Sequence, residues 1–389
     1  MRNAFAFGLL GLFGCVGVAA SGVPTGGAGA VRGGVSGLAR STEGWCQAKT
    51  STSWRHVLSR HIVPLSRTTP LRPMAAANDG RSLFAMIFTP SFTGVAEINV
   101  QTSAVTRIRA FPDPTPANGS EQADQAWGAF DGRWLVWNEY RGETNFNDFT
   151  TWAWDSRTGD LRQIGAATRG PGGQFWESPW RGPDVRDGVA TWVQGVGPDS
   201  LGEVHTYDLR SGRDRVVRRG HPSGAFMLAH HFVVWAESPK RGASTRMYTA
   251  NALTAKRIQT PRALRYANGV SGLYTDGQHI GYPSPRYRSL WWSPSLAKKP
   301  QKILTARGLN HIDNDVQING RYIGFGISPG VFIADTKTHR YVQIFGHGGS
   351  TLINSRTLLA SYASHSKLDP IQKVAMVPKR LLPPIIACH

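Results

Sequence analysis

The chain has 389 residues, of which 40% are hydrophobic and 18% charged, a composition typical of a folded globular protein. Its 44 Lys and Arg outnumber its 25 Asp and Glu, and the formal net charge of +19 favours polyanionic partners. The basic residues are nevertheless scattered, with short clusters such as those at 213–215 and 218–219. This scatter argues against a dedicated nucleic-acid surface, so we expect no specific nucleic-acid partner and leave an anionic polymer of the cell envelope open.

The first 20 residues have the features of a secretory signal peptide. A weakly positive start is followed by an apolar, Gly-rich stretch and by the small residues Val18, Ala19 and Ala20, which suit a cleavage site. The stretch is too short to span a membrane, and no stop-transfer pattern follows it. Leu12–Cys15 resembles a lipoprotein box only weakly because Phe13 is bulky, so we do not expect a lipid anchor. We predict a secreted protein, extracellular or periplasmic, with no transmembrane segment.

Beyond the leader, the chain divides by composition. The stretch 21–41 is rich in Gly, Ala, Val and Ser and carries little charge, which predicts a flexible segment. Trp45 and Trp54 then indicate packed structure, and His61–Leu65 is typical of an isolated strand. We therefore expect a signal peptide at 1–20, a flexible N-terminal segment at 21–41 and a single domain at 42–389.

One phrase recurs seven times in the domain: a tight turn, an apolar strand, a second strand, another turn and a third strand. The clearest copy has the turn Phe130–Gly132, the strands Trp134–Trp137 and Thr151–Asp155, and the strand Leu161–Ile164. The seven turns fall at Asp79-Gly80, Asp131-Gly132, Asp187-Gly188, His230-His231, Asp276-Gly277, Asn319-Gly320 and Ser355-Arg356. Recurrence at this spacing, with three or four short strands per copy, predicts a seven-bladed β-propeller of four-stranded antiparallel blades.

The residues before each turn are expected to form the innermost strand of each blade. They are short and rich in small residues, which suits crowding around an axis. We predict these strands at Gln125–Ala129, Trp180–Val185, Gly224–Leu228, Val270–Tyr274, Asp315–Ile318 and Ser350–Ile353. The next strands are apolar on both faces because blades stack on both sides, and Trp137, Trp192 and Trp235 are expected to pack between blades.

The ends of the chain predict how the ring closes. The last copy lacks an outer strand, whereas His61–Leu65 is a spare strand at the other end, so the N-terminal segment is expected to complete the final blade. Cys15 leaves with the leader, and the two remaining cysteines, Cys46 and Cys388, lie at opposite ends of the domain. A ring brings its ends together, so we favour a disulfide between them over two free thiols.

The repeated phrase resembles the TolB-like and WD-repeat-like β-propellers of exported bacterial proteins, over roughly Ala75 to Val377. The usual Ser-Pro-Asp-Gly turn is replaced here by Phe-Asp-Gly at 130, Arg-Asp-Gly at 186, Thr-Asp-Gly at 275 and Ile-Asn-Gly at 318. The resemblance implies an architecture and no particular activity, because propellers host many functions. The separate N-terminal domain of TolB has no room in this chain.

No nucleophile elbow, phosphate-binding loop, zinc signature or dinucleotide fingerprint is present, so candidate chemistry is positional. Loops leading into the innermost strands converge at one mouth of the central channel. The polar and aromatic residues of these loops that we predict to bind a ligand are Asp124, Glu177, Trp180, Asn268, His311, Asp313, Asp315 and His347, with His221 nearby. In an extended segment His311, Asp313 and Asp315 share one face, where they could hold a divalent cation or act as acid and base. Asp and Asn are also ordinary turn residues, and we expect no cofactor.

We therefore predict a secreted, non-enzymatic binding or scaffold propeller, acting as a monomer, that uses the loops at the channel mouth to bind a protein or a glycan. The alternative is a polysaccharide lyase or glycoside hydrolase that uses acidic and His residues at the same mouth. A glycosidase would require two carboxyl groups roughly 5–10 Å apart.

Overall fold

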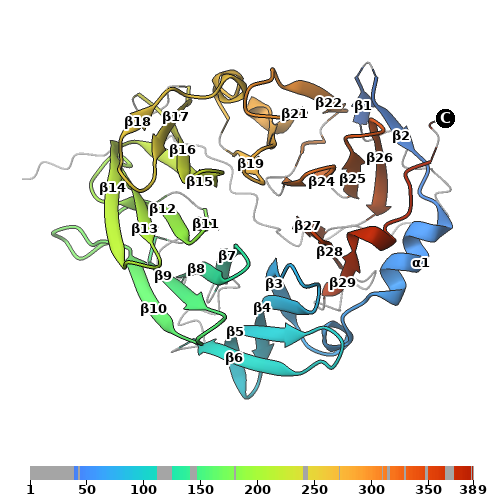
Figure 1. Ribbon diagram of the computed structural model, residues 1–389, viewed down its shortest axis with the longest axis horizontal. Helices are drawn as coiled ribbons and strands as arrows, with labels where there is room; N and C mark the ends of the chain where they lie inside the picture. Colours follow the sequence, from blue (N-terminus) through green and yellow to red (C-terminus); the bar gives the residue numbers. More distant parts are fainter. Residues whose placement is uncertain are drawn as a thin grey trace, which may run out of the picture. The chain divides into compact units, whose positions relative to one another are not determined.

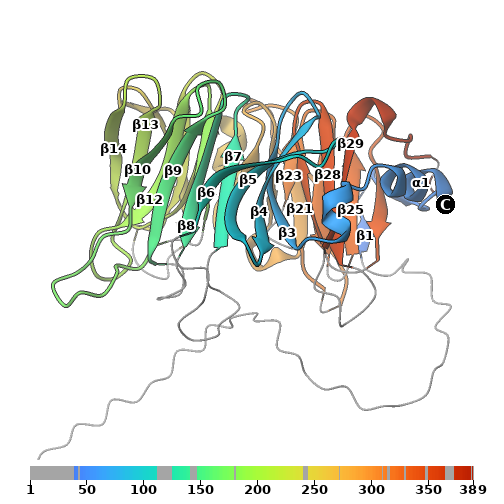
Figure 2. The same cartoon turned by 90° about the horizontal axis from the view of Figure 1, so that it is seen from below.

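A computed structural model describes the chain at residues 39–42, 44–111, 125–140, 147–178, 181–239, 244–270, 272–308, 310–312, 316–327, 330–346, 349–363, 372–386 and 388. The predicted signal peptide, and most of the predicted flexible segment, lie outside these residues. The described chain from Ala39 onward is a seven-bladed β-propeller, with the blades arranged around a central axis (Figure 1). Figure 2 shows the same strands from the side, running roughly along that axis. The predicted fold class is confirmed.

The first four blades are four-stranded antiparallel sheets in which the strands run in sequence order. Blade 1 contains β3 (Leu71–Ala76), β4 (Ser82–Thr89), β5 (Phe92–Asn99) and β6 (Val105–Ala110). Blade 2 contains β7 (Gln125–Phe130), β8 (Trp134–Tyr140), β9 (Phe149–Asp155) and β10 (Leu161–Ala166). Blade 3 contains β11 (Asp184–Arg186), β12 (Val189–Gly195), β13 (Gly202–Asp208) and β14 (Arg213–Gly220). Blade 4 contains β15 (Pro222–Leu228), β16 (Phe232–Glu237), β17 (Arg246–Asn251) and β18 (Arg257–Ile258).

The remaining blades follow the same order, and N-terminal strands add to two of them. Blade 5 contains β19 (Tyr274–Thr275), β20 (Ile280–Pro283), β21 (Ser289–Ser293) and β22 (Gln301–Ala306). Blade 6 contains β23 (Gln317–Asn319), β24 (Tyr322–Ile327), β25 (Gly330–Asp335) and β26 (Arg340–Phe345). Blade 7 contains β27 (Gly349–Ile353), β28 (Thr357–Ala363) and β29 (Gln372–Pro378). The N-terminal strand β1 (Ala39–Ser41) pairs antiparallel with β22, and β2 (Cys46–Ala48) pairs parallel with β26.

Short helices lie between these strands. The α-helix α1 (Thr52–Arg60) places Trp54 and Leu58 in a core cluster with residues of β28 and β29, on the outer side of blade 7. The 3-10 helices are η1 (Pro64–Arg67), η2 (Arg262–Tyr266), η3 (Pro285–Tyr287) and η4 (Lys379–Leu381).

The innermost strands are largely those predicted, but three of them are shorter. Those of blades 2, 4 and 7 match the predicted ranges closely. In blades 3, 5 and 6 the ladder is only two or three residues long, at β11, β19 and β23. Before β11, Gly182 and Pro183 line the channel, whereas Val270 and Leu273 before β19 and Val316 before β23 are buried in the core between blades.

Blade 7 is closed by the N-terminal segment, as predicted. Ile62 bridges antiparallel to Ala375 of β29. The amide of Val63 donates to the carbonyl of Val374 at 2.8 Å, and the amide of Met376 donates to the carbonyl of His61 at 2.9 Å. The segment at 61–63 thus takes the place of a fourth strand and covers the edge of β29. It is shorter than the predicted strand His61–Leu65, because Pro64–Arg67 form the 3-10 helix η1.

A disulfide joins Cys46 to Cys388, with a Cα–Cα distance of 5.8 Å that is ordinary for such a bond. The two cysteines are 342 residues apart in the sequence. Ala48 also bridges to Cys388, so the C-terminus is held against the strand that carries Cys46. The predicted meeting of the two chain ends is confirmed.

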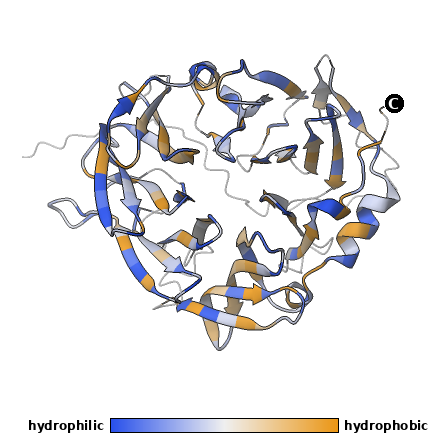
Figure 3. Cartoon of the chain, viewed as in Figure 1, coloured by the Kyte–Doolittle hydropathy of each residue, from blue (hydrophilic) through white to orange (hydrophobic). Residues whose placement is uncertain are grey.

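The core consists of layers between neighbouring blades. Trp137, Trp192 and Trp235 are at most 3% exposed and lie in three different clusters, as the repeat predicts. Burial of a large apolar side chain contributes roughly 1.5–3 kcal/mol, so these positions stabilise the stacking of the ring. In blade 2, Trp137 lies opposite Gly128 on one side and Trp152 on the other. The outermost strands are more polar, and Figure 3 shows hydrophilic residues along β10 and β14.

The Asp-Gly turns do more than reverse the chain: they connect blades. The Asp131 carboxylate accepts from the amides of Arg133 and Trp134 at 3.0 and 2.8 Å, within its own turn. Its second oxygen accepts from the Gly188 amide of blade 3 at 2.8 Å. Asp276 of blade 5 binds the Gly320 amide of blade 6 in the same way, at 2.6 Å.

The hydrogen bonds that connect the last blade to the first come from an amide side chain. The Asn354 side chain of blade 7 donates to the carbonyls of Ala76 and Ala77 in blade 1, at 2.8 and 3.2 Å. The turn residues therefore also fasten the ring where its two ends meet.

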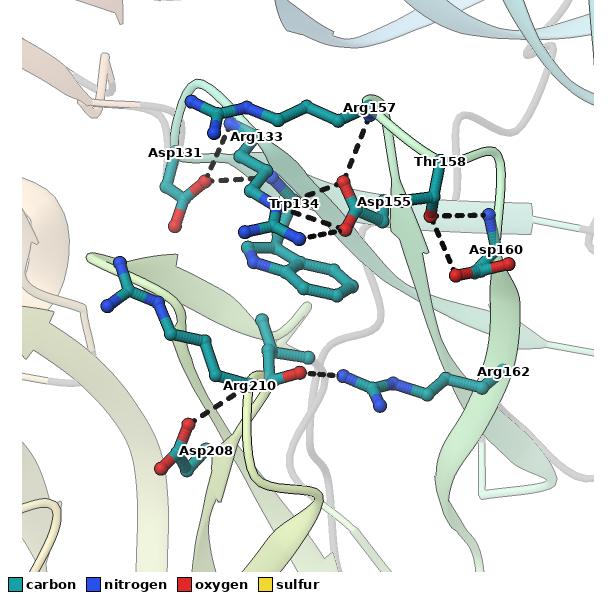
Figure 4. Close-up of polar contacts among 11 residues, drawn as sticks. Asp131, Arg133, Trp134, Asp155, Arg157, Thr158, Asp160, Arg162, Asp208 and Arg210 are labelled. Atoms are coloured by element: carbon teal, nitrogen blue, oxygen red, sulfur yellow. Dashed lines mark hydrogen bonds and ion pairs between the residues drawn. The ribbon is translucent and has the colours of Figure 1, made fainter.

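An ion pair between an arginine after the turn and an aspartate at the end of the third strand recurs in two blades. Arg133, which follows the turn glycine of blade 2, binds Asp155 at the end of β9 with its Nε at 3.0 Å (Figure 4). Arg133 also lies over the ring of Trp134, and Arg162 covers the same ring before donating to the Leu209 carbonyl of blade 3. Arg321 and Asp335 repeat the ion pair in blade 6. These arginines hold the turns to the blades and are not free for a ligand.

Candidate functional site: the central channel

The axis of the ring is hollow. A cavity of about 970 Å³ is lined by the innermost strands of all seven blades, whose arrangement around the centre is seen in Figure 1. Its volume lies at the upper end of the range of about 300–1,000 Å³ that is usual for ligand sites. The lining includes apolar residues such as Met74 and Ile318 together with many hydroxyl groups. The cavity can therefore take up a ligand of several rings or a stretch of extended chain.

One end of this cavity, here called the channel mouth, is formed by two sets of loops. The first set leads into the innermost strands and supplies Glu177 and His221. The second set joins the second and third strands and supplies Asp199, Ser200 and Tyr287. The Ser200 hydroxyl donates to the Glu177 carboxylate at 2.8 Å, which links the two sets in blade 3.

The loop at 198–201 is held in an unusual backbone conformation at the mouth. Asp199 and Ser200 have φ values of 56° and 61°, the left-handed region that normally suits glycine. The Leu201 amide closes the turn on the Pro198 carbonyl at 3.0 Å. Non-glycine residues in this region carry strain of order 1–3 kcal/mol each, and such strain concentrates at functional sites. The turn projects two polar side chains into the channel wall.

Arg181 is the only Lys or Arg among the described residues of the lining. Its backbone carbonyl accepts from the Tyr140 hydroxyl at 3.4 Å and from the Asn138 amide at 3.5 Å, which fixes its base beside blade 2. Its guanidinium carbon lies 5.2 Å from the ring centroids of both Phe226 and Tyr274, which belong to blades 4 and 5. The side chain thus crosses the wall of the channel from blade 3 toward blade 5.

Asp184 also lines the channel, but its carboxylate is bound by the protein. It accepts from its neighbour, the Val185 amide, at 2.9 Å and from the Met227 amide of blade 4 at 2.8 Å. Burial raises the pKa of Asp184 above its usual value, and Arg186 and the two amides only partly offset that effect. We interpret Asp184 mainly as a connection between blades 3 and 4.

His221 contributes an imidazole to the lining. Its Nδ1 atom is buried and has no hydrogen-bond partner among the described residues. His221 thus lines the mouth, while its Nδ1 atom is covered by the protein.

The structure places the predicted site residues in three groups. Glu177 lines the cavity. Asn268 and His311 are exposed and are not among the lining residues. The others, Asp124, Trp180, Asp313, Asp315 and His347, lie outside the described residues. The channel mouth as such was predictable from the repeat, whereas Arg181, Ser200 and Tyr287 were not singled out.

A signal for Arg181 was present in the sequence. It is the lone cation within the predicted innermost strand Trp180–Val185, among mostly small and apolar residues. The described residues contain no group of three His, Cys, Asp or Glu side chains placed to hold a metal ion. The cation site predicted at His311, Asp313 and Asp315 cannot be assembled from them, because two of its three members lie outside. Over the described residues, no helix has the length and apolar character needed to cross a membrane.

Comparison with known proteins supports the fold and gives no further information about the site. No known protein family and no curated protein matches the sequence. Among solved structures, oligogalacturonate lyase from Vibrio parahaemolyticus aligns with a TM-score of 0.51 and 10% identity, over 80% of this chain and 91% of that one. A prolyl endopeptidase aligns with a TM-score of 0.52 and 11% identity, over 84% of this chain and 50% of that one. TolB from Acinetobacter baumannii aligns with a TM-score of 0.36 and 12% identity, over 61% of this chain and 55% of that one.

These matches show a β-propeller. At such identities they transfer neither substrate nor mechanism, and the solved structures differ in function among themselves. The likeness to the lyase and to the prolyl endopeptidase is thus one of architecture. Any function has to be argued from the channel.

Proposed function

We propose that this chain is an exported binding protein that holds a glycan or an extended protein segment in its central channel, entered at the mouth formed by blades 3 to 5. The observation that carries the proposal is the cavity of about 970 Å³, whose lining includes Glu177, Ser200, His221 and Tyr287 together with Arg181. Sites of this kind combine an apolar wall with a few polar groups that orient the ligand. The disulfide between the chain ends suits an oxidising compartment outside the cytoplasm.

The proposal is tested by filling the channel. Ser223 lies on β15, lines the cavity and is half-buried, so Ser223→Trp places a large ring in the lumen. Ser59→Trp is the matched control because Ser59 is exposed on α1, on the outer side of the ring. A glycan and peptide binding screen, followed by calorimetry, should give a ligand whose affinity falls at least about tenfold in Ser223→Trp and is unchanged in Ser59→Trp. Equal affinity in both variants would place binding outside the channel.

A carbohydrate-active enzyme is the second candidate, and one observation favours it. His221 and Arg181 line the same cavity, and a base together with a cation is what the removal of a proton next to a carboxylate requires. Incubation with acidic polysaccharides would then produce unsaturated sugar ends, read from their absorbance. If no unsaturated product forms and no reducing ends appear while binding persists, the binding function stands alone.

A further inference from the structure

We infer that Arg181 forms a subsite for the carboxylate of a uronic-acid oligosaccharide bound in the channel. This inference rests on the proposed function and deepens it, since it names the class of ligand.

The first observation is that Arg181 carries a charge that the described protein does not neutralise. Its guanidinium makes no ion pair and no hydrogen bond with a described residue, although its backbone carbonyl accepts two. Other arginines of the molecule are paired: Arg109 with Glu139, Arg133 with Asp155, and Arg218 with Glu237. Two of the three described carboxylates that line the channel accept hydrogen bonds elsewhere, Glu177 from Ser200 and Asp184 from two backbone amides. The planar fork of Arg181 is therefore open to an anion, and a carboxylate is its best geometric match.

The second observation is that the surroundings hold the guanidinium in place. The rings of Phe226 and Tyr274 both lie 5.2 Å from it, within the range of a cation–π contact. Gly272 leaves the space that the side chain occupies, because a Cβ atom there would overlap the Nη2 atom of Arg181. Gly224 is close as well, since its Cβ would come within 3.0 Å of the Arg181 Cδ. A cation built into the wall in this way loses little entropy when it binds a ligand.

The third observation concerns the ligand's remaining surface. Serine and threonine residues line the channel from several blades: Ser178, Ser200, Ser223, Ser238, Thr275, Ser350 and Thr351. Some of their hydroxyls also bond within the protein, such as that of Thr275 to the His279 carbonyl. Gln317 and Asn354 add amide groups. Such a lining suits a ligand that carries many hydroxyls of its own, and aromatic faces such as Phe226 and Tyr274 suit the flat side of a sugar ring. The net charge of +19 favours an anionic chain over a neutral one at long range.

The experiment compares two trimers that differ only in their carboxylates, trimannuronate and mannotriose, by calorimetry on the full exported chain. We expect trimannuronate to bind more tightly. Arg181→Gln should weaken it by about 10- to 100-fold and leave mannotriose nearly unchanged, because a hydrogen bond to a charged group is worth about 1.5–3 kcal/mol. Arg181→Lys keeps the positive charge but loses the planar guanidinium. Its affinity for trimannuronate should therefore lie between those of the parent protein and Arg181→Gln.

Two further variants keep the result interpretable. Gly272→Ala retains the arginine but displaces it, and should lower trimannuronate affinity without changing the charge of the protein. Arg213→Gln removes an exposed arginine from β14 on the outer side of the same blade, and should leave affinity unchanged. Thermal unfolding of each variant shows whether it is folded.

The inference is overturned if folded Arg181→Gln binds trimannuronate as tightly as the parent protein, or if both trimers bind equally well. Binding of peptides with a free C-terminus, lost on amidation, in the absence of sugar binding would also overturn it. That outcome would leave the proposed binding function intact, whereas failure of every sugar and peptide to bind would remove the proposed function itself.

Discussion

At the scale of single residues, the polar groups of this protein mostly stabilise the turns and the contacts between blades. Asp276 illustrates this, because its carboxylate binds the ring of His279 at 2.8 Å and the Gly320 amide of the next blade. Burial alone would raise the pKa of Asp276, but these hydrogen bonds outweigh it and lower the pKa to about 2. The same contact raises the pKa of His279 above its usual value of 6.5. The pair therefore links proton binding to the contact between blades 5 and 6.

This linkage predicts a stability optimum in mildly acidic solution. The contribution of Asp276 is fully present above its ordinary value of 3.8 and is lost as the pH falls toward about 2. The contribution of the raised His279 pKa is fully present below 6.5 and is lost as the pH rises through its folded value. Denaturant unfolding at a series of pH values should show both losses, and His279→Gln should remove the one on the alkaline side. A variant whose profile keeps that alkaline loss would contradict the assignment.

At the scale of the element, the Asp-Gly turn is the repeating unit of both structure and stability. Asp131 accepts three backbone hydrogen bonds, two in its own turn and one from blade 3, whereas the exposed Asp79 of blade 1 accepts only local ones from Arg81 and Ser82. The same turn therefore has different consequences in different blades.

Asp131→Ala should accordingly cost about 1–3 kcal/mol in the free energy of unfolding, because it leaves partly buried amides without an acceptor. Asp79→Ala is the matched control and should cost clearly less. The measurement is the denaturant midpoint of each variant at constant slope. Equal losses would mean that the contact with the next blade adds nothing to the local turn.

At the scale of the whole molecule, closure joins segments that are far apart in sequence. The disulfide between Cys46 and Cys388 and the strand around Ile62 act on neighbouring blades, 6 and 7, so each should support the other. Replacing both cysteines by serine should lower the free energy of unfolding by about 2–5 kcal/mol while leaving the circular dichroism spectrum of the folded state unchanged. A thiol reductant should reproduce the loss in the parent protein and have no effect on the double variant. Unfolding of the parent that is insensitive to reductant would show that the bond does not act as a closure.

The order of these elements was readable from the sequence because the signal repeats. Seven turns in one order, a spare strand at His61–Leu65 and two cysteines at opposite ends together specify a closed ring. The lengths of β11, β19 and β23 were not readable, since a loop beside the axis and a strand beside the axis use similar small residues.

The candidate site was readable only in part. Glu177 and His221 follow from position alone, because loops before innermost strands must reach the mouth. The role of Arg181 depends on Phe226 and Tyr274. These residues lie 45 and 93 positions further along the sequence and contact Arg181 only in the folded ring. Contacts between residues so far apart leave no recognisable motif in the sequence around either residue.

The most direct test of the account is hydrogen exchange of the full chain with and without trimannuronate, read peptide by peptide. We predict slower exchange in the segments that line the channel in blades 3 to 5, around Arg181, β15 and β19, and no change along the outer strand β14. Protection confined to β14 and the other outermost strands, with the channel segments unaffected, would contradict it and would place the ligand on the outside of the ring.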